Sequence, residues 1–533
     1  MISARAIAVF LFSIGVATGA GFLRAQQKPL RVTARLVQIG VLVQDKHGNS
    51  LTGLTKDDFA LFDGKKRQNI DFFLVETNVA LPVAEPSQPP GTYTNEMEQR
   101  NTPSNLTVIL LDSFNTGFMD RAFARSQIVK LLLTIQPQDR VALYALGAHL
   151  HVLHEFTSDA SKLVALLQAY KEETTPDVDK SVSAPTGVFY KGLQQLAEDS
   201  GMDENQAFAR DHAQATAEAL RLIANHVGSL PGRKNLVWVS GNFPFNLDSD
   251  NLQRFDGQRL PFASDIELTV RALNNANMAL YPVDARGLMD TGPSEEGRVV
   301  SKRPDTSIFG TMQILAGRAG GRAYYNTNAI MGSIRQAMDD SRVVYELGFY
   351  PSDVTWDGSF HAIHVKVNRP DLRLQAREGY FALPEPNLAP EAWAELIAET
   401  ARGALEATEI RIRVQVVPAD PKDERKLKLS VSLDTQQFDF LQRNGQWNDS
   451  VETAVIQLDD RSRILRTSPL VLPLTLDPDT YEQLVKQGLS FIRELQILPG
   501  AAELRVIVRD GGNGRIGSVR IPLAAYFSGQ SKR

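Results

Sequence analysis

The sequence has 533 residues, of which 43 % are hydrophobic and 22 % are charged, and its formal net charge is -5. This length predicts about three or four folded domains, and the near balance of charges excludes the basic footprint of a nucleic-acid-binding protein. There is no cysteine, which excludes disulfides, thiolate nucleophiles and cysteine-ligated metals.

The N-terminus predicts export. Arg5 precedes an apolar run over residues 6–16, and Ala25 precedes a polar stretch. A cleavable signal peptide typically has a charged end, an apolar centre and a final small residue, and residues 1–25 show this pattern. The apolar centre is shorter than the about 20 residues that a transmembrane helix needs. An uncleaved signal anchor is the alternative. No other segment is predicted to span a membrane.

Residues 30–77 are predicted to form a small β domain. Apolar and β-branched residues over 32–43 and turn residues over 45–49 indicate strands joined by hairpins. A domain of this size is too small to be stable alone, so we expect it to dock on a neighbour. Five prolines between residues 78 and 104 predict a linker there.

Residues 105–342 are predicted to form a doubly wound α/β domain. The apolar run Leu106–Leu111 is typical of a strand that is buried on both faces of a parallel sheet. Strands and helices then alternate along the chain, which favours a mostly parallel sheet covered by helices. Further strands are expected at 141–146, 152–156, 235–240 and 279–284, and helices at 121–134, 160–170, 205–227, 263–276, 310–319 and 330–341.

The remainder is predicted to be β-rich. Strands over 343–382 are expected to pack on the N-terminal β domain or on the α/β domain, and residues 383–406 to form a linker and a helix. Alternating strands over 407–528 predict a C-terminal β-sandwich. The fold class is therefore multidomain α/β plus β, with a central doubly wound, mostly parallel sheet flanked by a small N-terminal β domain and the C-terminal sandwich.

The loop after the first buried strand is the best candidate for a binding site. Ligands of a doubly wound sheet bind beyond the carboxyl ends of its strands. Asp112 ends the strand, and Asn115 and Thr116 follow in the loop. Their oxygens suit a hard divalent cation, so the loop predicts a site for Mg²⁺ or Ca²⁺. The alternative is that Asp112 caps the loop by accepting hydrogen bonds from backbone N–H groups.

The segment Leu110–Thr116 and the order of the elements resemble the von Willebrand factor A fold and its metal-ion-dependent adhesion site. The chain is similar to exported bacterial "VWFA-related domain" proteins of the acidobacterial type over about residues 30–382, on its motifs taken together. The other segments that carry this resemblance are 54–62 before Asp63-Gly64, 231–241, 281–287 and 377–380.

The resemblance implies a set of metal ligands, from which the sequence departs in part. Asp112 matches the first position, and Thr116 stands for the second of two expected serines. Phe114 occupies the position of the first serine and removes that ligand. After the third buried strand, Ser240 stands where the family has an aspartate. Asp284, at the end of the next strand, is the candidate substitute for that aspartate.

These observations predict an exported, non-enzymatic, adhesion-type module that presents the carboxyl-edge loops of the A-like domain to a protein partner. The alternative is a structural or assembly scaffold of the cell envelope in which the metal site is vestigial. Nucleotide-binding glycine motifs and a Gly-x-Ser-x-Gly elbow are absent from the sequence, so no enzyme is predicted. His149, His151 and His154 cluster, but strand alternation places His149 and His151 on one face and His154 on the other, which does not favour zinc.

Overall fold

The computed structural model describes residues 37–46, 48–77, 91–96, 106–171, 204–230, 232–245, 263–288, 306–340, 342–351, 354, 359–382, 390–403, 405–420, 423–436, 438–443 and 445–527. The expected signal peptide of residues 1–25 lies outside these ranges. In the part of the chain that the model describes, no helix combines the length and the apolar character needed to cross a membrane.

A five-stranded sheet forms the centre of the α/β region, with strand order β10-β9-β6-β7-β8. Its strands are β6 (Leu106–Asp112), β7 (Arg140–Leu146), β8 (Leu150–Thr157), β9 (Lys234–Ser240) and β10 (Met278–Asp284). The pairings of β6, β7, β9 and β10 are parallel, and β8 is an antiparallel edge strand beside β7. The predicted mostly parallel sheet is confirmed.

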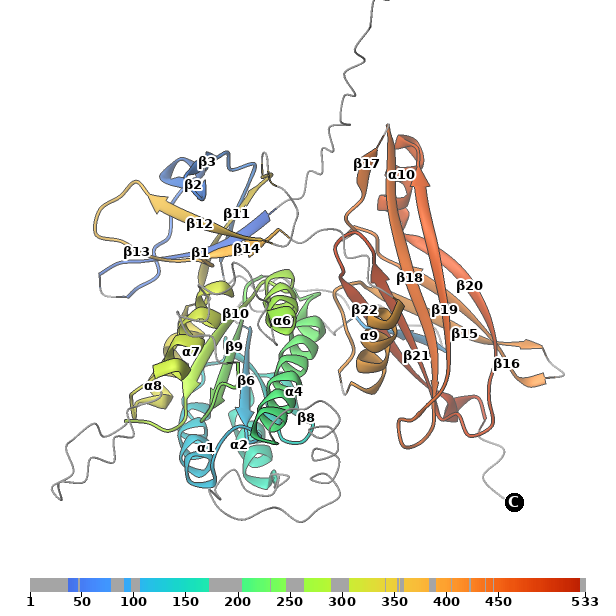
Figure 1. The fold of residues 1–533 in the computed structure, drawn as a ribbon, viewed down its shortest axis with the longest axis horizontal. Helices are drawn as coiled ribbons and strands as arrows, with labels where there is room; N and C mark the ends of the chain where they lie inside the picture. Colours follow the sequence, from blue (N-terminus) through green and yellow to red (C-terminus); the bar gives the residue numbers. More distant parts are fainter. Residues whose placement is uncertain are drawn as a thin grey trace, which may run out of the picture. The chain divides into compact units, whose positions relative to one another are not determined.

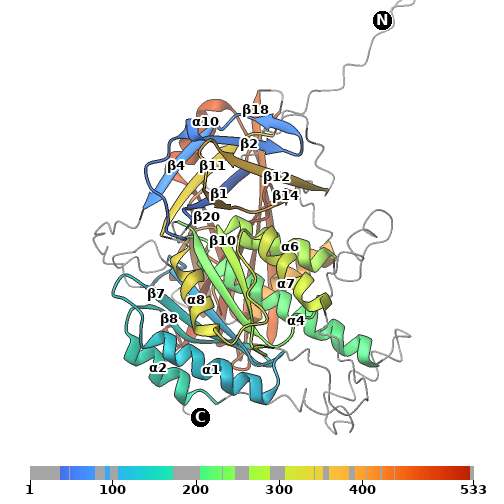
Figure 2. The same ribbon diagram turned by 90° about the vertical axis from the view of Figure 1, so that its left-hand side faces the viewer.

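Helices cover both faces of this sheet (Figure 1), which is why every residue of β6, β9 and β10 is buried. Figure 2 shows α8 and α4 on opposite sides of the strands. One face packs on α1 (Phe118–Leu132), α2 (Ala160–Ala169) and α8 (Ile330–Asp339). The other face packs on α4 (Glu204–Val227), α6 (Ala263–Asn275) and α7 (Thr306–Arg318).

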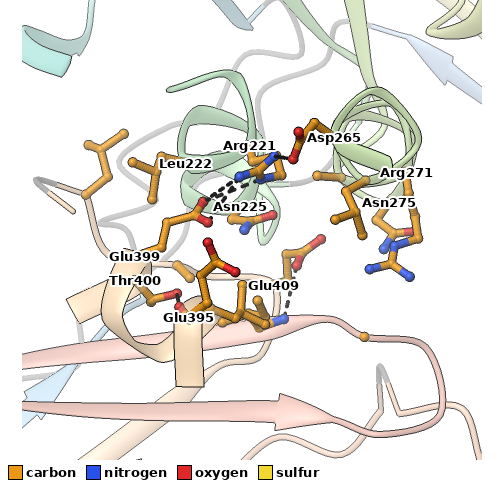
Figure 3. Close-up of a pocket in the computed structure, with 17 residues that line it drawn as sticks. Arg221, Leu222, Asn225, Asp265, Arg271, Asn275, Glu395, Glu399, Thr400 and Glu409 are labelled. Atoms are coloured by element: carbon orange, nitrogen blue, oxygen red, sulfur yellow. Dashed lines mark hydrogen bonds and ion pairs between the residues drawn. The ribbon is translucent and has the colours of Figure 1, made fainter. Parts of the chain in front are cut away.

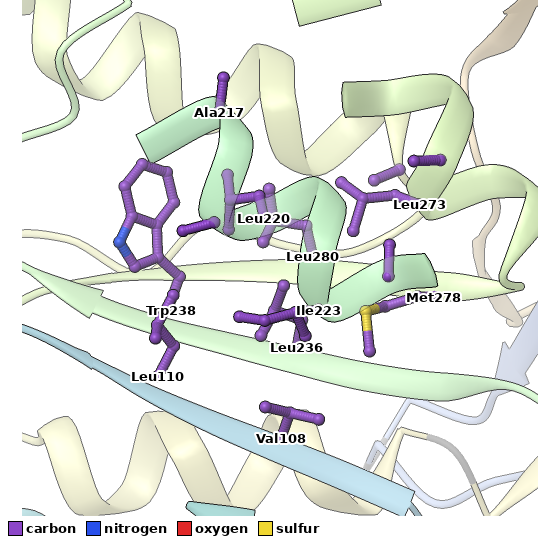
Figure 4. Packing of buried hydrophobic residues seen from close by; sticks show 14 of the residues in the cluster. Val108, Leu110, Ala217, Leu220, Ile223, Leu236, Trp238, Leu273, Met278 and Leu280 are labelled. Carbon is purple, nitrogen blue, oxygen red and sulfur yellow. The ribbon is translucent and has the colours of Figure 1, made fainter. Parts of the chain in front are cut away.

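The two-residue alternation of a strand divides β6 between the two cores. Val108 and Leu110 belong to the hydrophobic cluster that also contains Leu220 of α4 and Leu273 of α6 (Figure 4). Ile109 and Leu111 face the opposite core, with α1 and α8. Because neither face of the strand meets water, the sequence reads as the continuous apolar run from which the strand was predicted.

Two four-stranded sheets share a hydrophobic core that is separate from the two cores of the central sheet. Each of these sheets combines strands that precede the α/β region in the chain with strands that follow it. The orders are β13-β1-β11-β4 and β14-β12-β2-β3. Their strands are β1 (Val37–Gln44), β2 (Phe59–Asp63), β3 (Lys66–Gln68), β4 (Phe72–Thr77), β11 (Val343–Phe349), β12 (Phe360–Val367), β13 (Arg373–Gln375) and β14 (Gly379–Phe381). The segment 343–382 therefore completes the sheets of the N-terminal strands, and the two segments bury one hydrophobic cluster.

The C-terminal region also has two sheets around one core, with strand orders β20-β16-β15-β5 and β17-β18-β21-β22, and with β19 paired to β18. A helix, α9 (Pro390–Arg402), precedes it, and α10 (Pro478–Gln487) lies within it. Its strands are β15 (Ile412–Asp420), β16 (Asp423–Leu433), β17 (Leu441–Arg443), β18 (Gln446–Leu458), β19 (Ile464–Leu476), β20 (Leu489–Gln496), β21 (Glu503–Asp510) and β22 (Ile516–Pro522).

The prediction of a linker over 78–104 is corrected by β5 (Thr92–Thr94), which lies inside it and pairs with β15. Three residues are too few to show a two-residue alternation, so the neighbouring prolines dominated the pattern. The helix α10 was also missed, although Asp477 before Pro478 is a helix-start signal, and the Asp477 side chain accepts a hydrogen bond from the N–H of Thr480.

Candidate functional site

Asp112 lies at the carboxyl end of β6 and is completely buried. Its Oδ1 accepts a hydrogen bond from the backbone N–H of Asn115 at 2.9 Å. Its Oδ2 accepts three more, from the Asn115 amide at 2.8 Å, the Trp238 indole at 2.9 Å and the Ser240 hydroxyl at 2.8 Å. Four donors from β9 and from the carboxylate's own loop therefore surround this group.

A second layer links this loop to α4. The Asn115 amide also donates to the Thr216 hydroxyl at 2.9 Å, and the Asn115 carbonyl oxygen lies 2.9 Å from Nδ1 of His212. The Phe114 ring stacks on the His212 imidazole, with centroids 3.9 Å apart and planes within 9°. Phe114, which replaces an expected oxygen ligand, therefore serves as a packing surface for the helix.

Thr116 and Ser240 close the loop against the end of β9. The Thr116 hydroxyl donates to the backbone carbonyl of Asp112 and accepts from the N–H of Gly241 at 2.8 Å. A Cβ atom at Gly241 would stand 3.1 Å from the Thr116 methyl group, so the two loops approach closely. The structure thus brings together Asp112, Asn115, Thr116 and Ser240, which are four of the five metal ligands proposed from the sequence.

Asp284 ends β10, but within the described part of the chain no hydrogen bond joins its carboxylate to Asp112, Asn115, Thr116 or Ser240. Its carboxylate accepts from Nε and Nη2 of Arg286 at 2.9 and 2.8 Å, and from the Arg286 backbone N–H at 3.0 Å. The side chain is buried and its charge is compensated by a guanidinium two residues away. A pairing of this kind stabilises the turn after β10.

The residues present do not fit a divalent cation at Asp112. Burial raises the pKa of the Asp112 carboxyl, and N–H and O–H donors oppose that rise. These donors occupy the carboxylate, and N–H groups cannot coordinate a cation. Among the described residues, no group of three or more His, Asp or Glu side chains is placed to hold a metal. The observed bond from the Asn115 N–H is the one expected of a carboxylate that caps its loop.

Sequence reasoning missed His212, Thr216 and the role of Trp238. Trp238 lies in the strand that was predicted at 235–240 and is completely buried, yet its indole also donates to Asp112. A buried tryptophan needs a partner for its N–H, which is a signal that the sequence offered. His212 and Thr216 are four residues apart on α4, one helical turn, but nothing in the sequence points that turn at β6.

Apolar side chains are exposed at the same edge of the sheet. Phe118 and Met119 begin α1 directly after the Asp112 loop and are 62 % and 74 % exposed. Leu288 lies four residues beyond β10 and is 60 % exposed, while its backbone N–H donates to the Asn328 side chain at 2.9 Å. We call Phe118, Met119 and Leu288 the carboxyl-edge apolar residues.

Comparison of the sequence with models of protein families and with curated proteins gives no match. Similar solved structures include a von Willebrand factor type A protein from Catenulispora acidiphila, with 11 % identity, a TM-score of 0.23 and coverage of 79 % of this chain and 77 % of that one.

Two further similar structures come from the genus Bacteroides and from Porphyromonas. An aerotolerance-related membrane protein from Bacteroides fragilis has 15 % identity, a TM-score of 0.25 and coverage of 44 % of this chain and 98 % of that one. Three N-terminal domains of the type V pili tip protein Mfa5 from Porphyromonas gingivalis have 9 % identity, a TM-score of 0.27 and coverage of 85 % and 96 %. Likeness at this level assigns no function.

Proposed function

We propose that the protein is an exported, non-enzymatic protein-binding module of the von Willebrand factor A type, which contacts its partner through the loops after β6 and β10. The observation that carries the proposal is the exposure of Phe118, Met119 and Leu288 at one edge of the sheet. Large apolar side chains exposed on loops at the same edge of the sheet lose contact with water when a partner covers them, which favours binding.

In this proposal the partner is a protein with an apolar contact surface, and binding needs no metal. Asp112 supports the edge from inside by holding the loop that precedes Phe118. Arg121 adds a polar margin, because its guanidinium lies 5.9 Å from the Phe118 ring and donates to the Ser113 carbonyl at 3.2 Å. An apolar centre with a charged margin is common in protein interfaces.

The second candidate is a scaffold of the cell envelope whose A-like domain has no ligand at this edge. The hydrogen-bonded Asp112 favours it, because a fully satisfied carboxylate is typical of a structural position. In that case the contacts of the protein would lie elsewhere, for example on the C-terminal sandwich.

Site-specific photo-crosslinking in the cells that produce the protein distinguishes the two. A photoreactive amino acid is placed at Phe118, at Leu288 or, as a matched control, at Leu465 on β19, which is an apolar residue 38 % exposed. We expect one protein adduct of the same mass from positions 118 and 288, and its loss when Met119→Ser is added.

The same crosslinking with EDTA tests the metal. An unchanged adduct in EDTA supports metal-free binding, and an adduct that needs Mg²⁺ or Ca²⁺ would show that the predicted metal site is real. An adduct only from position 465 would overturn the proposal and favour the scaffold.

A further inference from the structure

A pocket of about 180 Å³ lies where α4 and α6 meet α9 and the beginning of β22 (Figure 3). It does not include the carboxyl-edge apolar residues. Its lining contains four carboxylates, Asp265, Glu395, Glu399 and Glu409, and two guanidiniums, Arg221 and Arg271. The ionised lining is therefore acidic.

One guanidinium serves two of the four carboxylates. Both oxygens of Glu399 accept from Nη2 of Arg221, at 3.1 and 3.2 Å. A second nitrogen of Arg221 lies 3.8 Å from Asp265. Arg271, Arg515 and Lys234 act electrostatically on Glu409, and among the ionised lining residues the carboxylates still outnumber the guanidiniums by four to two.

Glu409 is the distinctive group of the pocket. It is only 7 % exposed, and its Oε2 accepts a hydrogen bond from the backbone N–H of Ile516 at 3.0 Å. Its Oε1 is buried and has no hydrogen-bond partner among the described residues. Figure 3 shows the Glu409 carboxylate directed into the space between the helices, with Glu395 beside it. A buried acceptor without a donor is costly, so this atom suits a ligand that donates.

The rest of the wall is largely aliphatic. Its apolar members are Leu222, Leu268, Ala272, Leu396, Leu405, Ala407 and Ile516. Such a wall packs against methylene groups, and its uncharged polar members are Asn225, Asn275 and Thr400. Among the described residues, no group of three or more His, Asp or Glu side chains is placed to hold a metal ion. Donation to a lone carboxylate oxygen beside an aliphatic surface is the chemistry of an alkylammonium group.

We propose that this pocket binds a small alkylammonium compound, with the ammonium group donating to Glu409 and Glu395 and with its alkyl chain against the leucines of α4, α6 and α9. Burial raises the pKa of Glu409 to about 7, and a bound cation would offset that cost by stabilising the ionised form. Occupation would join residues of the α/β region to residues of the C-terminal region across the pocket.

The test uses the full chain and two probes, 1,4-diaminobutane and Nα-acetyl-lysine amide, in isothermal titration calorimetry at constant ionic strength. The first probe represents a free diamine and the second a lysine side chain. We expect saturable binding of at least one probe, weakened at least tenfold by Glu409→Gln and by Glu395→Gln. The matched control is Glu494→Gln, which removes one charge from exposed β20 outside the pocket and should leave binding unchanged.

Binding of the diamine alone, of the lysine analogue alone or of both identifies the source of the alkylammonium group. No saturable heat with either probe would overturn the proposal, as would equal binding by the Glu409→Gln variant. Circular dichroism of each variant verifies folding, and Glu395→Gln, at an exposed position, keeps the test valid if Glu409→Gln does not fold.

Discussion

At the scale of the residue, Asp112 shows how a carboxylate changes role with its neighbours. The same position in a strand-to-loop junction supplies a metal ligand when oxygens surround it and a structural acceptor when N–H groups do. Here Asn115 and Trp238 provide those N–H groups, and Phe114 fills the place of an oxygen. Asp112 is therefore held in this loop as a structural acceptor.

Replacing Asp112 by Asn tests this role. The substitution points an NH₂ group at one or more of the donors that now serve the carboxylate, so we expect a loss of about 2 to 4 kcal/mol in local stability. Hydrogen exchange of the β6 and β9 amides measures it. Ser113→Ala is the control, because the buried Ser113 hydroxyl has no partner among the described residues. Equal exchange in both variants would contradict the assigned role.

At the scale of the element, α4 is attached to the β6 loop through His212 and Thr216. His212 stacks on Phe114 and bonds to Asn115, and both contacts join the helix to the loop rather than to the sheet. Burial lowers the pKa of His212 to about 4. The neutral imidazole is thus the form that this packing requires.

This lowered pKa predicts that the docking of α4 weakens in acid. The unfolded chain binds a proton at His212 near pH 6.5, so stability is present above that pH and falls as the pH drops towards 4, by about 3 kcal/mol in all. Hydrogen exchange of α4 amides at pH 7 and pH 4.5 measures this. The His212→Gln variant should show a smaller pH dependence, whereas His364→Gln, at an exposed position on β12, should behave like the parent.

At the scale of the whole molecule, strands that are far apart in the sequence pair in the same sheet. β1 to β4 precede the α/β region and β11 to β14 follow it, yet they pair with each other. Between them, the short strand β5 joins the C-terminal sheet about 320 residues before its partner β15. The three sheet systems are therefore connected by the path of the chain as well as by their contacts.

Asn95, next to β5, anchors this crossing. Its amide donates to the carbonyls of Ala407 and Ile410 at 2.6 and 2.8 Å, and its oxygen accepts from the N–H of Ile412 at 2.7 Å. Asn95→Ala leaves these buried groups unpaired, so we expect a loss of about 2 to 4 kcal/mol that is confined to the C-terminal sheets.

Hydrogen exchange separates the regions, because unfolding of a multidomain chain is not described by a single transition. The β15 amides should exchange faster in Asn95→Ala than in the parent, and the β6 amides should not change. Glu96→Gln, whose exposed side chain makes only a 3.5 Å ion pair with Arg413, is the control and should leave both unchanged. Faster exchange throughout the chain would contradict a local anchor.

The sequence by itself determined those helices and strands whose burial produces a local pattern of apolar residues. The run at 106–111 and the alternating strands and helices predicted the parallel sheet, and the cluster Asp112, Asn115, Thr116 and Ser240 followed from the rule that parallel strands end at one edge. These inferences hold because burial on two faces and strand direction leave a trace in neighbouring residues.

Only the tertiary structure decided which distant partners complete each site. Three features join residues that are more than 90 positions apart in the chain. These are the strand pairing between 37–77 and 343–381, the pairing of β5 with β15, and the contacts of His212 and Trp238 with the Asp112 loop. The acidic pocket around Glu409 is likewise assembled from separate elements. Such contacts depend on how the elements pack, and a single sequence carries no local periodicity that encodes them.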